Sequence, residues 1–310
     1  MTATGQQGVA LITALIVVAI VASLAAWLAT SQEVWFRQTT NLAEGAQAQA
    51  VTHGALEFAA LSLDTEGKNT TDDDLTQPWA QPLPLFPVAG GAVTARAEDA
   101  EGRFNLNNLF HNGSPDPTQM GVFQYLLQEA DLNPSLASGV VAWLANSAAV
   151  SLSNPADSYY LALPEPYRAG AQPFADSSEL QLVQGFGARA YAKLRPWVTA
   201  LPVTAGVTPI NINTAPLPVL AAVFPGAGIS AVQAVIAQRA HNPFTSLAQA
   251  QAVLPAASGT AVAPYGIRSS YFEVLVQAHF GRITERTAAM IYRPLSQPAS
   301  ILWASRYWAS

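Results

Sequence analysis

An apolar run near the start of the chain limits what this protein can fold into. The run extends from Val9 to Ala29, and its only polar residues are Thr13 and Ser23. No side chain from residue 1 to residue 32 carries a charge. About 20 residues at about 1.5 Å each form a helix that crosses about 30 Å of hydrocarbon. The run is therefore long enough to span a bilayer as one helix.

Three interpretations fit an apolar run at this position. A secretory signal peptide has a basic start and a shorter apolar centre, whereas residues 1–8 contain no Lys or Arg. A plain signal anchor needs only the length. In the third interpretation, residues 1–8 are a short polar leader that ends in Gly8.

A polar leader that ends in Gly and is followed at once by an apolar helix resembles the class III signal of type IV pilins and pseudopilins. The resemblance implies that a prepilin peptidase cuts after Gly8 and methylates the new N-terminus, so that Val9 becomes mature residue one. Thr13 then stands at mature position five, where most pilin-like subunits carry Glu. Lack of this Glu is typical of the K-type minor pseudopilins of type II secretion systems, the GspK family, and it implies a place at the filament tip.

The helical pattern continues beyond the apolar run. No Pro occurs in residues 30–63, and apolar or small residues recur every three or four positions at Val51, Ala55, Phe58 and Ser62. An anchor followed by a separate amphipathic helix is one interpretation. Gly45 and Gly54 favour it, because Gly destabilises a helix relative to Ala. Because no turn signal separates the halves, we expect a single helix of about 80 Å.

Three shorter segments follow this helix. Asp72, Asp73 and Asp74 suit either a cation site or an exposed acidic turn, and we expect the turn because calcium sites usually take separated ligands. The Pro-rich segment 78–87 predicts an extended connector. The alternation of apolar and polar residues in 93–98 predicts a half-buried strand.

The segment from Asp99 to Leu109 reads D-A-E-G-R-F-N-L-N-N-L. Gly102 suits a turn, Phe104 and Leu106 suit inward positions, and the Asn side chains can bond to nearby backbone. The segment resembles the D-x-x-G-R-F-N-L-N-x-L motif of the K-type pseudopilins. The resemblance continues through Pro-Tyr-Arg-Ala at 166–169, Ser-Glu-Leu at 178–180 and Asn-Thr-Ala at 213–215, and so covers nearly the whole chain.

Residues 110–265 are mainly helical in pattern, and helices are expected at 117–130 and 134–144, with a loop at 154–157. Some family members bind calcium in this region, at a D-W-L-D-A-D segment that resembles the sequence around Trp143. Non-acidic residues stand at the usual Asp positions, and Asp157 is the acid that remains nearby; the replaced positions are Ala142, Ala145 and Ser147. We therefore expect no calcium and no other cofactor.

A segment within residues 213–254 resembles a helix-hairpin-helix unit, whose Gly-rich hairpin can bind phosphate through backbone N–H groups. Packing is the alternative role, and we expect it because the nearest basic residue is Arg239. The chain has a net charge of −6 with only 14 Lys and Arg, which also disfavours a nucleic-acid partner.

Beyond residue 265 the period changes to two, which predicts strands at 272–280 and 288–292, a turn at Gly281-Arg282, and a third strand at 301–307. We expect this hairpin to pair with the strand at 93–98. The fold class is therefore α+β: a pseudopilin fold with a long N-terminal helix, an antiparallel sheet and a large inserted, mainly helical domain.

The expected domain boundaries follow from these elements. In chain order they are a leader at 1–8, a membrane-spanning part of the helix at 9–29, a periplasmic part at 30–63, a head formed by 64–109 with 266–310, and an inserted domain at 110–265.

The sequence contains no enzyme motif around its scattered histidines, His53, His111, His241 and His279, and we expect a protein without catalytic residues. The resemblance implies a structural subunit that caps the pseudopilus tip and helps to initiate its assembly for protein export. Its implied partners are the I-type and J-type minor pseudopilins, other pseudopilins and the prepilin peptidase, with an anchor in the inner membrane and a periplasmic head. A signal-anchored periplasmic binding protein unrelated to a filament is the alternative.

Overall fold

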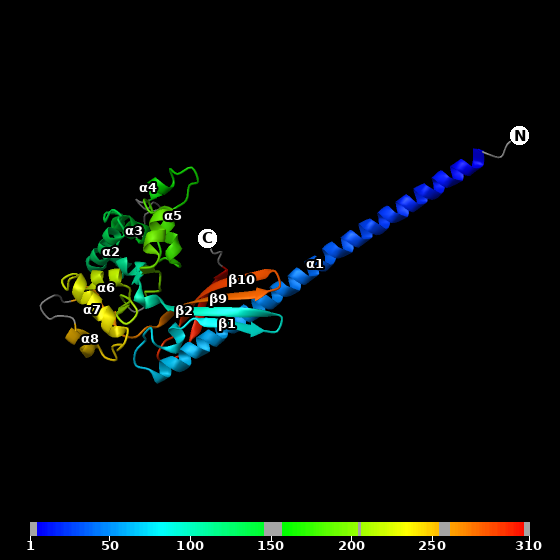
Figure 1. Ribbon diagram of the computed structural model, residues 1–310. Helices are drawn as coiled ribbons and strands as arrows, with labels where there is room; N and C mark the ends of the chain where they lie inside the picture. Colours follow the sequence, from blue (N-terminus) through cyan, green and yellow to red (C-terminus); the bar gives the residue numbers. More distant parts are fainter. Residues whose placement is uncertain (1–4, 146–156, 204–205, 254–260, 307–310) are drawn as a thin grey trace.

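A computed structural model describes residues 5–145, 157–203, 206–253 and 261–306 of the chain. Its first element is α1 (Gly5–Asn69), a helix of 65 residues whose N-terminal half projects from a head (Figure 1). The prediction of one uninterrupted helix is confirmed. The helix continues past residue 63, where an ion pair between Lys68 and Asp64 (2.7 Å), one turn apart, supports its last turns.

A five-stranded antiparallel sheet lies against the C-terminal half of α1. The spatial order of its strands is β1 (Leu83–Val88), β2 (Gly91–Asp99), β9 (Tyr271–Phe280), β10 (Ile283–Tyr292) and β11 (Ser300–Arg306). The predicted C-terminal hairpin is thus β9 and β10, and its pairing with the strand at 93–98 is confirmed by the β2–β9 ladder. The predicted third strand is β11.

One face of the sheet buries its apolar residues against α1. Leu56 and Leu63 of α1 meet Phe272, Val274 and other residues of β9 in a common core. Trp79, in the short 3-10 helix η1 (Pro78–Ala80), packs edge-on against Phe272 with ring centroids 5.1 Å apart. Burial of apolar surface contributes a free energy of about 25 cal/mol per Å², and burial of this face therefore holds the C-terminal half of α1 on the head.

The Pro-rich segment is more ordered than the connector predicted from its sequence. Residues 83–88 form β1, which pairs with β2 at the edge of the sheet. Pro84 and Pro87 have no N–H to donate, and the ladder tolerates them because one side of an edge strand has no neighbour. The extended conformation was predicted, but the pairing was not.

The prediction of an exposed acidic turn at residues 72–74 is wrong. Asp72, Asp73 and Asp74 are all buried, and Asp73 is fully so. The segment is tucked under the end of α1, where Asp74 accepts hydrogen bonds from the backbone and hydroxyl of Thr76 (both 2.6 Å). Burial is possible because Asp73 pairs with a buried arginine, Arg293.

The chain between β2 and β9 builds a mainly helical region beyond one end of the sheet (Figure 1). Its α-helices are α2 (Pro117–Glu129), α3 (Leu136–Leu144), α4 (Asp157–Tyr160), α5 (Gly187–Leu194), α6 (Leu217–Val223), α7 (Ile229–Arg239) and α8 (Leu247–Val253). Its 3-10 helices are η2 (Ala100–Gly102), η3 (Leu106–Leu109) and η4 (Ser177–Leu182). The predicted helix at 117–130 is confirmed as α2, whereas α3 begins two residues later than expected.

Short strand pairs tie this region together. The pairs are β3 (Phe104–Asn105) with β6 (Val198–Thr199), β4 (Phe110–His111) with β5 (Ser114–Pro115), and β7 (Ile210–Asn211) with β8 (Tyr265–Gly266). Most of the expected loop at 154–157, and Ser147, lie outside the described residues. The architecture confirms the predicted α+β class, while the exact domain boundaries stay a prediction.

Candidate functional site

The two residues expected to flank the processing site lie in the first turns of α1. Both Gly8 and Val9 belong to this helix, which begins at Gly5. Val9 and the apolar residues that follow it up to Ala29 are exposed. Within the described chain, α1 is the one helix long and apolar enough to cross a membrane.

The hydroxyl group of Thr13 is hydrogen-bonded within its own helix. Its Oγ1 lies 3.0 Å from the carbonyl oxygen of Val9 and 2.9 Å from that of Ala10, so the hydroxyl can donate to the preceding turn. A polar group in hydrocarbon is costly unless it is hydrogen-bonded. Thr13 therefore needs no neighbouring subunit to complete its bonding, whereas a carboxylate at this position would need a partner charge.

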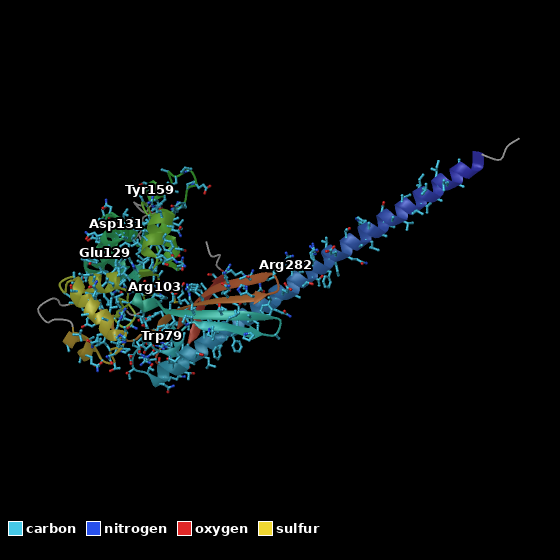
Figure 2. All side chains as sticks on the ribbon, viewed as in Figure 1. Trp79, Arg103, Glu129, Asp131, Tyr159 and Arg282 are labelled. Carbon is cyan, nitrogen blue, oxygen red and sulfur yellow. The ribbon has the colours of Figure 1, made fainter. Side chains whose placement is uncertain are left out.

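The helix first touches the head at the turn between β9 and β10. The Glu44 carboxylate accepts a hydrogen bond from the backbone N–H of Arg282 (3.3 Å). Gly281 has a φ of 51° and lies so close to Glu44 that a side chain there would displace the carboxylate. The predicted turn thus also fixes the point at which α1 leaves the head, beside the labelled Arg282 in Figure 2.

Two arginines cap the C-terminal end of α1. The Arg293 guanidinium donates to the carbonyl oxygen of Leu63 (3.3 Å), and Arg268 donates to that of Gly67. The last four carbonyls of a helix have no partner within it and carry partial negative charge, so a cation there is favourable; the carbonyl of Gly67 is one of these four, and that of Leu63 lies one turn earlier. Arg268 comes from the segment that returns from the helical region and Arg293 follows β10, so both parts of the head are bound to the end of α1.

Arg293 also forms a buried ion pair. Its Nη2 lies 2.6 Å from one Asp73 carboxylate oxygen and 2.7 Å from the other, and it donates to the carbonyl oxygen of Ser269 (2.8 Å). The guanidinium also stacks 4.6 Å from the centre of the Phe272 ring. The exposed fractions of the Arg293 and Asp73 side chains are 4% and 0%, so neither charge has water to replace its partner.

Asp99, at the end of β2, collects hydrogen bonds from three segments. Its carboxylate accepts from the Thr214 hydroxyl (2.6 Å), the Ser269 hydroxyl (2.7 Å), the Asn211 amide (2.9 Å) and the backbone N–H of Glu101 (2.8 Å). Burial raises the pKa of Asp99, and the hydroxyl donors oppose that rise. This carboxylate therefore joins the end of β2 to the segment before α6, which holds Asn211 and Thr214, and to Ser269, just before β9.

Asp73, Asp99, Glu101 and Arg293 form a buried polar cluster at the end of α1, called the junction below. Within it, the burial of the Glu101 carboxyl group is offset by few hydrogen bonds. Its side chain accepts one hydrogen bond, from the backbone N–H of Ser270 (2.9 Å). Burial raises the pKa of Glu101 to about 8, and the negative charge of Asp99 adds to the rise. Glu101 is consequently protonated at neutral pH, because a second buried negative charge beside Asp99 would be costly.

Three asparagines, two in the G-R-F-N-L-N segment and one directly after it, use their side-chain amides to pair with the backbone of distant residues. The Asn105 side chain accepts from the N–H of Leu201 (2.9 Å) and donates to its carbonyl (3.1 Å). Asn107 makes the same two bonds with Phe174 (2.8 and 2.9 Å), and Asn108 makes them with Thr208 (2.9 and 3.0 Å). Each amide therefore fixes a loop that is distant in sequence, and the motif is explained by packing.

Arg103 of the same motif links the two parts of the head. Its guanidinium lies 2.6 Å from the Glu273 carboxylate of β9, and both side chains are largely buried. Figure 2 shows Arg103 between the sheet and the helical region. The Arg103–Glu273 ion pair is thus a further contact that holds the helical region on the sheet.

The basic residue nearest in sequence to the hairpin between α6 and α7 is Arg239. Arg239 is buried and donates to the carbonyl oxygens of Ile212 and Ala215 (2.6 Å for Ala215). Burial lowers the pKa of Arg239 to about 10. Its donors face the chain's own backbone, which agrees with the packing role expected for this segment.

Comparison with known proteins identifies the family. Two family profiles, each described as Type II secretion system (T2SS), protein K, match residues 102–203 and 210–268. Type II secretion system protein K of Pseudomonas aeruginosa is 33% identical over 293 residues, covering 89% of this chain and 86% of the relative. The chain belongs to the type II secretion system protein K family. The protein K of Pectobacterium carotovorum is 31% identical and covers 89% of each chain.

A solved structure shows the same fold as this chain. It is a crystal structure of the GspK-GspI-GspJ complex from the type 2 secretion system of enterotoxigenic Escherichia coli. The match has a TM-score of 0.69 at 26% identity and covers 88% of this chain and all of the matched chain. Together with the relatives, it confirms the family and the fold class predicted from the sequence, and it supports the role of a minor pseudopilin in secretion.

Sequence reasoning missed the junction at the end of α1. Thr13, Gly8 and Val9 lie far from it along the helix. Asp73 was expected in an exposed acidic turn, and neither Glu101 nor Arg293 was assigned a role. One signal was present: the adjacent acids at 72–74 follow directly after a helix end, where a buried cation is a plausible partner. The arginine itself is more than 200 residues away, so no local pattern connects the two.

Proposed function

We propose that this protein sits at the tip of a type II secretion pseudopilus and helps to initiate its assembly. Its helix would be anchored in the inner membrane, its head would lie in the periplasm, and its partners would be I-type and J-type minor pseudopilins and other pseudopilins. The matched GspK lies in a complex with GspI and GspJ, which supports this choice of partners.

The internally bonded Thr13 is the observation that carries the proposal. A subunit added beneath others gains from a carboxylate that meets the amine of its neighbour, because a buried charge is stable only when paired. The Thr13 hydroxyl is bonded within its own helix. This subunit can therefore lie in the membrane or at the tip with no neighbour above it, and the helical region extends the head beyond the sheet.

Processing after Gly8 tests the proposed class. Intact mass and N-terminal peptide analysis of the full chain, expressed with and without a prepilin peptidase, should show a start at Val9 only when the peptidase is present. The variant G8A should keep its leader, while T4A serves as a matched control that is still processed. An unprocessed start under both conditions would contradict the pseudopilin assignment and favour the alternative, a signal-anchored periplasmic binding protein.

Thr13 gives a second prediction. We expect T13E to give no gain in crosslinking of this chain to its I-type and J-type partners over wild type, because the tip position offers no neighbouring amine to pair with the new carboxylate. T13V, which removes the hydroxyl at nearly the same volume, is the matched control and should behave similarly. Crosslinks that place wild-type chain within the body of the filament, between other subunits, would be inconsistent with the tip.

We propose that the protein holds no resident calcium and has a structural role without catalysis. Among the described residues no group of three or more His, Cys, Asp or Glu side chains could hold a metal. Asp157 is occupied by the backbone N–H of Ala169 (2.9 Å) and by Arg168 (3.6 Å). Millimolar calcium should therefore shift the melting temperature by less than about 1 °C relative to magnesium; a rise of several degrees, abolished in D157N, would overturn this prediction.

A further inference from the structure

A pocket of about 210 Å³ lies between α1 and the end of β11. It is lined by His53 and Leu56 of α1, Glu285 and Thr287 of β10, and Arg306 of β11, with a few of their neighbours. A cavity of about 150 Å³ in a protein interior can hold benzene. The pocket therefore has room for one aromatic side chain.

The ladder between β10 and β11 stops short of the start of β10. Among the residues that the structure describes, its last pair is Thr287 with Arg306. Residues 283–286 of β10 pair with residues 277–280 of β9 on one side. Their other side faces the line along which β11 runs, and the backbone of a sheet edge offers N–H and C=O groups for a further strand. Residues 307–310, which follow β11, have the register to pair there.

Continued by two residues, this register sets Trp308 opposite Glu285. Side chains of a strand alternate between the two faces of the sheet, so Trp308 would share a face with Arg306. That face is the one toward α1, because Glu285 and Arg306 both line the pocket and form an ion pair there (2.5 Å). The Cβ atoms of directly opposite residues lie about 5 Å apart. The ring of Trp308 would therefore enter the pocket.

The chemistry of the pocket suits an indole. Leu56, which is only 2% exposed, supplies apolar surface from the core. The Glu285 side chain is largely buried and is bonded to Arg306 through one oxygen. A carboxylate has about four acceptor sites, so Glu285 can accept from an indole N–H as well. A buried Trp needs apolar contact for its ring and an acceptor for its N–H.

Continuity of the chain selects this ring over one from another protein. The Cα of Trp308 lies about 7 Å along the strand from that of Arg306, which already lines the pocket. A tethered group has a high effective concentration and does not lose the translational freedom that a separate partner would lose. The register also fixes its orientation.

We infer that residues 307 and 308 extend β11 along β10 and that the Trp308 ring fills the pocket between α1 and the sheet. The ring then fastens the packed half of α1 near its middle, between the Glu44 contact and the junction. This inference does not depend on the proposed function, because it concerns only how α1 is held on the head.

Contact quenching of a bimane label by tryptophan tests the inference on the full chain in detergent. The chain contains no Cys, so H53C places one label at an exposed position beside the pocket. We expect Trp308 to quench this label and the emission to rise in H53C/W308F. W303F is the matched control, since Trp303 lines a cleft on the opposite face of the sheet. A label at F58C, on the β1 side of α1, should not respond to W308F.

Hydrogen exchange tests the strand pairing separately. Neighbouring residues of a strand direct their N–H groups to opposite sides, so one of Tyr307 and Trp308 donates toward β10, and Pro removes that donor. Either Y307P or W308P should therefore speed exchange of the amides at 283–286 relative to wild type.

The contrary outcomes are distinct. Unchanged emission in H53C/W308F would overturn the inference, and protection of the label only when I-type and J-type partners are added would assign the pocket to another chain. Unchanged exchange in both proline variants would show that β11 ends at Arg306, which would also contradict the inference.

Discussion

Replacing Arg293 with Met is expected to lower the free energy of unfolding of the head by about 3–5 kcal/mol. The substitution keeps an unbranched side chain beside Phe272 but leaves the Asp73 carboxylate buried without its cation. It also removes the donors to the carbonyl oxygens of Leu63 and Ser269. For a head of this size the melting temperature should fall by about 10 °C. Chemical unfolding of the full chain in detergent measures the free energy, and a thermal scan measures the melting temperature, both followed by near-UV circular dichroism.

Two further variants show whether the loss comes from the broken pair. R96A removes one partner of an exposed ion pair, Arg96 with Glu98 at 3.4 Å, and should cost less than about 1 kcal/mol. The double variant D73N/R293M removes both charges and should be more stable than R293M alone, because no uncompensated charge then remains. If R293M costs no more than R96A, the ion pair does not hold the junction.

The long helix and the C-terminal strands could be predicted because their signals are local. A long stretch without Pro defines α1, and partial alternation of apolar and polar residues indicates β9 and the second half of β10, whereas the first half of β10 was not predicted. The pairing of β2 with β9 was predicted as well, but its register was not. The helix and the individual strands depend only on residues that are near one another in the sequence, whereas the pairing of β2 with β9 joins distant segments.

The junction could not be predicted because its partners are distant in sequence. Asp73 reads as part of a charged turn until the fold brings Arg293 to it, and the same fold converts the three adjacent acids from exposed to buried. The asparagines of the motif give a similar case. Their side chains bind the backbones of Leu201, Phe174 and Thr208, about 70 to 100 residues away, so their spacing alone suggests only local turns.

The processing and assembly residues depend on a different kind of signal. Gly8, Val9 and Thr13 lie on an exposed helix end whose chemistry involves a peptidase, a membrane and other subunits. Their geometry in a single chain shows only that the Thr13 hydroxyl is satisfied and that the surrounding surface is apolar. The family resemblance, rather than a local structural feature, gave these positions their roles, and the processing experiment decides them.

Raising the pH from 5 to 9 is expected to destabilise the head through Glu101. The pKa of Glu101 is raised from 4.5 to about 8 in the folded protein by burial and by the Asp99 charge. Between these values the folded state keeps a proton that the unfolded chain has released. The free energy of unfolding therefore falls as pH rises, by up to about 1.4 kcal/mol per pH unit from this group. Below pH 4.5 and above about 8 its contribution is constant.

The variant E101Q separates this contribution from those of other groups. Gln keeps an oxygen that can accept from Ser270 but has no charge to lose, so E101Q should match the wild type within about 1 kcal/mol at pH 5 and exceed it by a few kcal/mol at pH 9. Urea unfolding at pH 5, 7 and 9 measures the difference, with E57Q, at an exposed position, as the matched control. A constant difference between E101Q and the wild type across this range would show that Glu101 is ionised in the folded junction. The single-donor environment of Glu101 would then not set its protonation.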